Sequence, residues 1–124
     1  MSKKPYILYI EDEPAMLELT RQALKVSGYS LSVATSGQQG LSMIRQQKPD
    51  VLLLDLMMAD FNGWDIYRQL KTDEELSNIP VIVITAKHPT PNSHVIIEDL
   101  PPVEAYLTKP FDIDHLLQSV QSYL

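Results

Sequence analysis

The sequence predicts an α/β fold in which a parallel sheet is covered by helices on both faces. Short runs of β-branched, aromatic or purely apolar residues alternate five times with helix-like segments. Two of these runs, Val51–Leu54 and Val81–Ile84, are apolar throughout, as expected for strands buried on both faces. Strands that alternate with helices in this way are joined by right-handed crossovers and therefore run parallel.

The first strand and helix are predicted near the amino terminus. Tyr6–Ile10 is rich in aromatic and β-branched residues and predicts a strand. Pro14 suits the first turn of a helix, which then extends over Ala15–Ser27 and stops at Gly28. The expected buried face of this helix contains apolar residues three or four positions apart: Met16, Leu19, Ala23 and Val26, widened by Leu17 and Leu24.

The second strand and helix follow directly. In Ser30–Ala34 apolar residues alternate with serines, which is typical of a strand near the edge of a sheet. Ser36 is positioned to cap a helix that ends at Lys48 and Pro49. The residues of this helix expected to face inward are Leu41, Met43 and Ile44.

The second half of the chain contains three further strands. We predict strands over Val51–Asp55, Val81–Ile84 (ending on Thr85) and Glu104–Thr108. We predict helices from Gly63 to about Thr72 and from about Asp112 onward. The apolar residues of the last helix lie on one face: Ile113, Leu116, Leu117, Val120 and Leu124. Prolines before Asn92 and after Leu100 limit any helix between them to about nine residues, or roughly 13 Å. We therefore expect a shortened fourth helix.

Composition restricts the class of protein. The chain of 124 residues fits one domain, 1–124, and its 44% hydrophobic and 21% charged residues are ordinary globular usage. A net charge of −6 argues against direct binding to nucleic acid, and the absence of cysteine excludes disulfides. No stretch approaches the roughly 20 apolar residues of a membrane helix. We expect a cytoplasmic protein.

Polar residues follow four of the predicted strands. The carboxyl ends of parallel strands share one edge of the sheet, so these residues should converge there. Oxygen ligands with room for water suit Mg²⁺, and the carbonyl of Met57 is a further candidate ligand. No His or Cys joins the group, which disfavours zinc. The converging residues are Glu11, Asp12, Asp55, Thr85 and Lys109.

This set of side chains predicts phosphoryl transfer. Beside a metal, Asp55 can act as a nucleophile towards phosphorus and form an aspartyl phosphate. Lys109 would pair with one phosphoryl oxygen and the Thr85 hydroxyl would donate to another. Each residue alone has an ordinary structural explanation, such as a loop cap, a counterion or a turn. Their joint occurrence at four strand ends favours the chemical function.

The same positions lie in four motifs, YIEDE, LLLDLMM, ITAK and YLTKPF, and a fifth motif, FNGWD, contains Gly63. Together they resemble the motifs of response-regulator receiver domains of two-component signalling, over essentially the full length of the chain. The resemblance implies a flavodoxin-like, doubly wound sheet of five strands in the order 2-1-3-4-5.

The resemblance also implies a function. Asp55 would accept a phosphoryl group from a sensor histidine kinase or a histidine phosphotransfer protein, and Thr85 and Tyr106 would form a switch pair. The protein would catalyse only its own phosphorylation and dephosphorylation, and would signal to a downstream protein or a missing output domain. The implied Mg²⁺ ligands are Glu11, Asp12, Asp55 and the Met57 carbonyl.

Two segments depart from the family pattern. Ala59 stands where the family often has proline, and LPPVEAYL replaces the usual Gly-Ala step before the fifth strand.

Three other functions compete with the phosphorylation switch. A receiver-like scaffold that docks partners without phosphorylation is the main alternative. A phosphatase of the haloacid dehalogenase type would need a second aspartate where Met57 stands. Flavin binding is disfavoured because the acidic loop after the first strand would repel a flavin phosphate.

Overall fold

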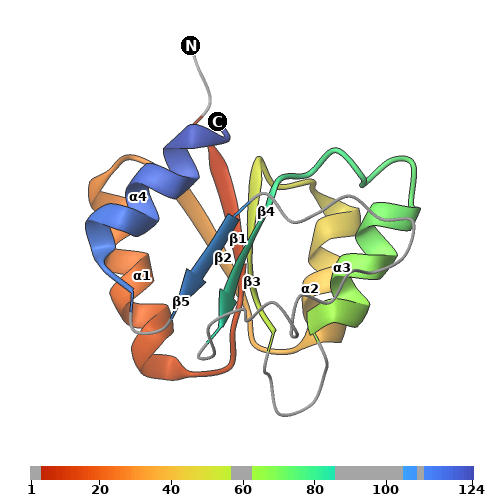
Figure 1. Ribbon diagram of the computed structural model, residues 1–124, viewed down its shortest axis with the longest axis horizontal. Helices are drawn as coiled ribbons and strands as arrows, with labels where there is room; N and C mark the ends of the chain where they lie inside the picture. Colours follow the sequence, from red (N-terminus) through yellow and green to blue (C-terminus); the bar gives the residue numbers. More distant parts are fainter. Residues whose placement is uncertain (1–3, 57–62, 86–104, 109–110) are drawn as a thin grey trace.

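The computed structural model describes residues 4–56, 63–85, 105–108 and 111–124. Strands and helices alternate as far as residue 85, and the strands form one sheet with helices on both sides (Figure 1). The elements are β1 (Tyr6–Ile10), α1 (Pro14–Val26), β2 (Ser30–Ala34), α2 (Gly37–Gln46), β3 (Val51–Asp55), α3 (Gly63–Thr72), β4 (Val81–Thr85), β5 (Ala105–Thr108) and α4 (Ile113–Ser122).

All neighbouring strands of the sheet run parallel, in the order β2-β1-β3-β4-β5. The predicted α/β fold with a parallel sheet is therefore confirmed. β2 lies at one edge, as its alternating sequence predicts, while β1, β3 and β4 are flanked on both sides. Residues Val51–Leu54 and Val81–Ile84 are fully buried, which confirms the interpretation of these apolar runs as central strands.

The side chains of the central strands divide between two apolar layers. α1 and α4 cover one face of the sheet, and α2 and α3 cover the other (Figure 1). Because successive strand residues point to opposite faces, Tyr9 and Leu53 join the first layer, while Leu8 and Leu52 join the second. Each strand residue in the middle of the sheet is therefore enclosed by a helix layer.

Helix α1 begins at Pro14 and ends at Val26, close to the predicted bounds. Its predicted buried face is partly wrong. The buried side chains are Leu17, Thr20 and Leu24, whereas Leu19 is 45% exposed and Val26 is 88% exposed. The apolar residues of this helix extend around more than one side, so their spacing identifies a helix without identifying the side that faces the sheet.

The ends of the helices follow the local sequence signals. Gly28 has a φ of 85°, which explains why the chain can turn sharply after α1. Ser36 caps α2 as predicted, because its Oγ accepts a hydrogen bond of 3.1 Å from the backbone N–H of Gln39. Leu124 lies beyond the end of α4 and is 48% exposed, so its predicted place on one helix face with Leu116 and Val120 is wrong.

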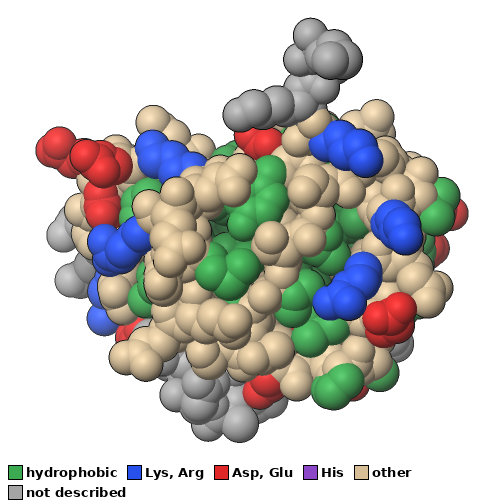
Figure 2. All heavy atoms as spheres, turned by 180° about the vertical axis from the view of Figure 1, so that it is seen from behind, with side chains coloured by type: hydrophobic (Ala, Val, Ile, Leu, Met, Phe, Trp, Pro, Cys, Tyr) green, Lys and Arg blue, Asp and Glu red, His purple; other side chains and the backbone are tan. Residues whose placement is uncertain are grey.

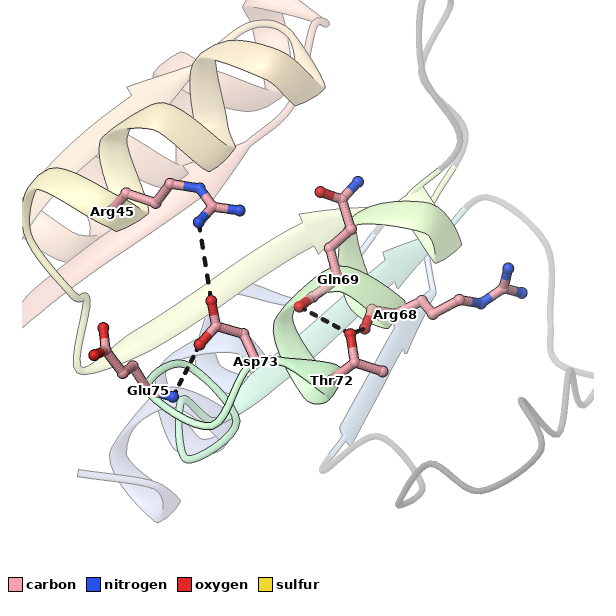
Figure 3. Close-up of polar contacts among 6 residues, drawn as sticks. All are labelled: Arg45, Arg68, Gln69, Thr72, Asp73 and Glu75. Carbon is pink, nitrogen blue, oxygen red and sulfur yellow. Dashed lines mark hydrogen bonds and ion pairs between the residues drawn. The ribbon is translucent and has the colours of Figure 1, made fainter.

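The connection from α3 to β4 is held by several polar contacts (Figure 3). Thr72 Oγ1 donates a hydrogen bond of 2.8 Å to the carbonyl of Arg68 in the last turn of α3. Asp73 Oδ1 accepts from the N–H of Glu75 at 2.9 Å, and its Oδ2 lies 3.9 Å from a guanidinium nitrogen of Arg45 on α2. The ion pair is largely solvated and so contributes little stability on its own.

Lys71 anchors the same connection from inside. Its side chain is buried, and Nζ donates to the carbonyls of Ser77 at 3.1 Å and Ile79 at 3.0 Å. Nζ also lies 5.7 Å from the centroid of the Tyr67 ring. These contacts supply the partners that a buried ammonium group requires, and they hold the chain where it enters β4.

Charged side chains of both signs are interspersed on the surface shown in Figure 2, with hydrophobic side chains between them. None of the helices in the described part of the chain has the length and apolar character that a membrane crossing requires. The shortened helix expected between Asn92 and Leu100 lies outside the described residues, as does Ala59.

Candidate functional site

Glu11 follows β1 and Asp55 ends the neighbouring strand β3, at the same edge of the sheet. β1 and β3 pair in a register that sets Ile10 opposite Leu54, so the next residue of each chain segment lies beside the other. Glu11, Asp12 and Asp55 each offer one carboxylate oxygen, and these three oxygens lie within 4.8 Å of one another. Glu11 is 0% exposed and Asp55 is 2% exposed, while Asp12 is open to solvent.

The Glu11 carboxylate is held by main-chain and side-chain donors. Its Oε2 accepts hydrogen bonds from the N–H groups of Asp12 at 3.1 Å and Glu13 at 3.4 Å, at the entrance to α1. Its Oε1 accepts from the hydroxyl of Tyr9 at 3.1 Å. The positive end of the α1 dipole stabilises negative charge at this place.

The Tyr9 hydroxyl is a feature of the site that sequence reasoning missed. Burial raises the pKa of Tyr9 far above its ordinary value, and the negative charges of Glu11 and Asp55 raise it further. The side chain of Thr20, which is buried on α1, lowers the pKa of Tyr9 and so offsets a part of this rise. The spacing of Tyr9 and Glu11 could have revealed this contact, because residues two positions apart along a strand lie on the same face of the sheet.

Gly63 brings the start of α3 against the end of β3. Its N–H donates to the carbonyl of Leu56 at 3.2 Å. A Cβ at this position would lie 2.6 Å from the carbonyl oxygen of Asp55 and 2.7 Å from Cα of Leu56. Only glycine allows this close approach, so the FNGWD motif fixes the backbone that carries Asp55.

The structure places the other predicted site residues only in part. Thr85 is the last residue of β4, one position beyond Ile84, which pairs with Asp55. Tyr106 belongs to β5 and pairs with Val83 of β4. The switch roles of the Thr85 and Tyr106 side chains stay predictions. Two further candidates lie outside the described residues: Met57 and Lys109.

The three carboxylates suit a hard divalent cation. All donors in the group are oxygens, and the described members include neither His nor Cys. Mg²⁺ binds through a few carboxylates and keeps several waters, which the exposed position of Asp12 allows. Two of the three charges are buried, and a cation would offset their mutual repulsion. The donor set therefore fits Mg²⁺.

Comparisons with known proteins agree with this geometry. Residues 7–121 match the family described as the response regulator receiver domain. The chain is 33% identical over 120 residues to the DNA-binding dual master transcriptional regulator RpaA of Synechocystis sp., covering 97% of this chain and 49% of RpaA. It is 31% identical over 118 residues to the polar-differentiation response regulator DivK of Brucella ovis, covering 95% of this chain and 94% of DivK.

A solved structure shows the same fold. The chain superimposes with a TM-score of 0.85 on the signal receiver domain of a signal transduction histidine kinase from Syntrophus aciditrophicus, at 27% identity, covering 97% of this chain and 89% of that one. The chain thus spans about half the length of RpaA and nearly all of DivK. It belongs to the response regulator receiver domain family of two-component signalling.

Proposed function

We propose that Asp55 accepts a phosphoryl group from a phosphohistidine in a reaction that requires Mg²⁺, and that its phosphorylation changes a surface read by a downstream partner. One observation supports this most strongly: Asp55 is buried at the carboxyl edge of the sheet, with the oxygens of Glu11 and Asp12 within 4.8 Å. Receiver domains are signalling switches that use Mg²⁺ and interact with histidine kinases and downstream effectors.

In the proposed reaction an Asp55 carboxylate oxygen attacks phosphorus. The new bond joins this oxygen to phosphorus while the bond between phosphorus and the histidine nitrogen breaks. The electron pair returns to that nitrogen, and the histidine leaves as neutral imidazole because its other nitrogen already carries a proton. Mg²⁺, when bound, supplies charge neutralisation for the transferring group.

The residues of this chain position and stabilise the transferred group. Glu11 and Asp12 would hold the cation with Asp55 and the Met57 carbonyl. Lys109 would pair with one phosphoryl oxygen, and the Thr85 hydroxyl would donate to another and turn towards it, with the Tyr106 ring moving in response. Hydrolysis by water would return Asp55 to its carboxylate and release inorganic phosphate.

Phosphate on Asp55 would add negative charge where the structure already gathers three carboxylates. We infer that this local change biases the protein between two surface conformations, of which the partner binds one more tightly. In this proposal a sensor histidine kinase or a histidine phosphotransfer protein donates the phosphoryl group. The changed surface is read by a separate downstream protein or by an output domain attached to the chain.

Intact mass spectrometry tests the proposal. The protein is incubated with acetyl phosphate in the presence or absence of Mg²⁺, and wild type is compared with Asp55→Asn. We expect a single phosphoryl adduct that requires both Asp55 and the metal. Asp65→Asn is the matched control, because Asp65 is an exposed aspartate at the start of α3 and should leave the adduct intact.

Two results would contradict the proposal. An adduct of equal yield in Asp55→Asn would place the phosphoryl group elsewhere. If wild type forms no adduct and also fails to bind beryllium fluoride, a mimic of the phosphoryl group, the site is inactive and docking without phosphorylation becomes the better explanation.

A further inference from the structure

Tyr9 brings its hydroxyl into the largely apolar layer of the core that α1 and α4 cover. Its side chain is fully buried among the residues covered by α1 and α4. Burying a hydroxyl is unfavourable unless the group forms a hydrogen bond, and here it donates to Glu11 Oε1 at 3.1 Å. The hydroxyl is therefore directed at one of the three clustered carboxylates.

The contacts of Glu11 divide between its two oxygens. Main-chain N–H groups of Asp12 and Glu13 donate to Oε2, and Tyr9 donates to Oε1. A glutamate has one more rotatable bond than an aspartate, and contacts at both oxygens restrict its carboxylate plane more than contacts at one oxygen would. Each carboxylate oxygen has two lone pairs, so a bond from Tyr9 does not by itself prevent Oε1 from facing a cation or its water.

We propose that Tyr9 is a positioning residue that orients the Glu11 carboxylate for Mg²⁺ binding by Glu11, Asp12 and Asp55. The proposal rests on the proposed function, since it assumes that these carboxylates hold Mg²⁺. Groups that hydrogen-bond a metal ligand commonly change metal affinity by about 10- to 100-fold, because they fix the orientation of the ligand. Tyr9 acts on the metal through Glu11 and not by contact with the phosphoryl group.

Calorimetric titration with Mg²⁺ alone tests this role. Tyr9→Phe removes the hydroxyl and keeps the ring that fills the core, and we expect Mg²⁺ to bind it about tenfold more weakly than wild type. Tyr29→Phe is the matched control, because Tyr29 packs against the same apolar layer and is half-buried. Its Mg²⁺ affinity should equal that of wild type.

A double-mutant cycle separates positioning from general loosening of the core. Without a carboxylate at Glu11, Tyr9 has no ligand to orient, so Tyr9→Phe should have little effect on Mg²⁺ affinity in the Glu11→Gln background. Thermal melts of each variant with and without Mg²⁺ give a second measure of affinity, which also applies to a destabilised variant.

The possible outcomes are distinct. Wild-type Mg²⁺ affinity in Tyr9→Phe overturns the role of Tyr9 and leaves the proposed function intact. An equal loss of affinity in the wild-type and Glu11→Gln backgrounds shows a structural effect and also overturns it. If wild type itself binds no Mg²⁺, both the metal site and the role of Tyr9 are refuted.

Discussion

Neutralising Asp55 should make the metal-free protein more stable. Asp55→Asn keeps the size of the side chain and its ability to form hydrogen bonds but removes one of three negative charges whose oxygens lie within 4.8 Å of one another. The substitution therefore relieves repulsion that folding creates, since the unfolded chain holds these charges apart.

The structure sets the size of this effect. Two unit charges 4.8 Å apart repel by about 3 kcal/mol at an effective dielectric constant of about 20. This value applies to Asp55 and Glu11, which are both buried, while solvent screens the contribution of Asp12. Other contacts of these side chains offset part of the repulsion, so we expect a net gain of about 1–2 kcal/mol in the free energy of unfolding.

Urea denaturation followed by the fluorescence of Trp64 measures the difference. In EDTA, Asp55→Asn should unfold at a higher urea concentration than wild type, and added Mg²⁺ should stabilise wild type much more than the variant. Glu74→Gln controls for net charge, because Glu74 is exposed in the α3–β4 connection and its neutralisation should change little. A variant that is less stable than wild type in EDTA would refute the argument from repulsion.

Four further variants test other parts of the structure by chemical denaturation. Gly63→Ala should lower the free energy of unfolding by about 1–3 kcal/mol and weaken Mg²⁺ binding, because the added Cβ would meet backbone atoms at Asp55. Gly28→Ala is the control: it should strain only the local backbone, by about 1 kcal/mol, and leave Mg²⁺ binding unchanged. Lys71→Met should lower the free energy of unfolding by about 2–3 kcal/mol, because the carbonyls of Ser77 and Ile79 lose their hydrogen-bond donor. An unchanged denaturation midpoint would show that water replaces this donor. Because the pKa of Tyr9 is raised, the folded protein keeps a proton that the unfolded chain loses above pH of about 10. Above this pH the free energy of unfolding of wild type should therefore fall more steeply than that of Tyr9→Phe, by up to about 1.4 kcal/mol per pH unit. If the free energy of unfolding falls equally with pH in wild type and Tyr9→Phe, the raised pKa is contradicted.

Local signals predicted most of the fold. The apolar runs Val51–Leu54 and Val81–Ile84 are central strands, Ser36 caps its helix and Gly28 ends another, because each of these features depends on neighbours in the sequence. The side of α1 that faces the sheet was predicted only in part, as the exposure of Val26 shows. Its orientation depends on the shape of the sheet, which spacing along one helix does not contain.

The site was predictable to the extent that it follows from parallel strands. Glu11 and Asp55 converge because they lie at the carboxyl ends of β1 and β3, which share one edge of the sheet. The contacts of Tyr9 and Lys71 were not predicted, because both depend on which polar atoms remain buried after packing. A tyrosine in a strand or a lysine near the end of a helix is ordinarily satisfied by solvent.

The alternation of side chains along β1 has a consequence for insertions and deletions. Tyr9 and Glu11 share the α1 side of the sheet, while Leu8 and Ile10 share the α2 side. Deleting one residue within β1 would exchange the two sets, moving apolar side chains between layers and turning Glu11 away from Asp55. Deletion or insertion of one residue in this strand should therefore abolish metal binding even in variants that fold, whereas a change of two residues would keep each side chain on its own face.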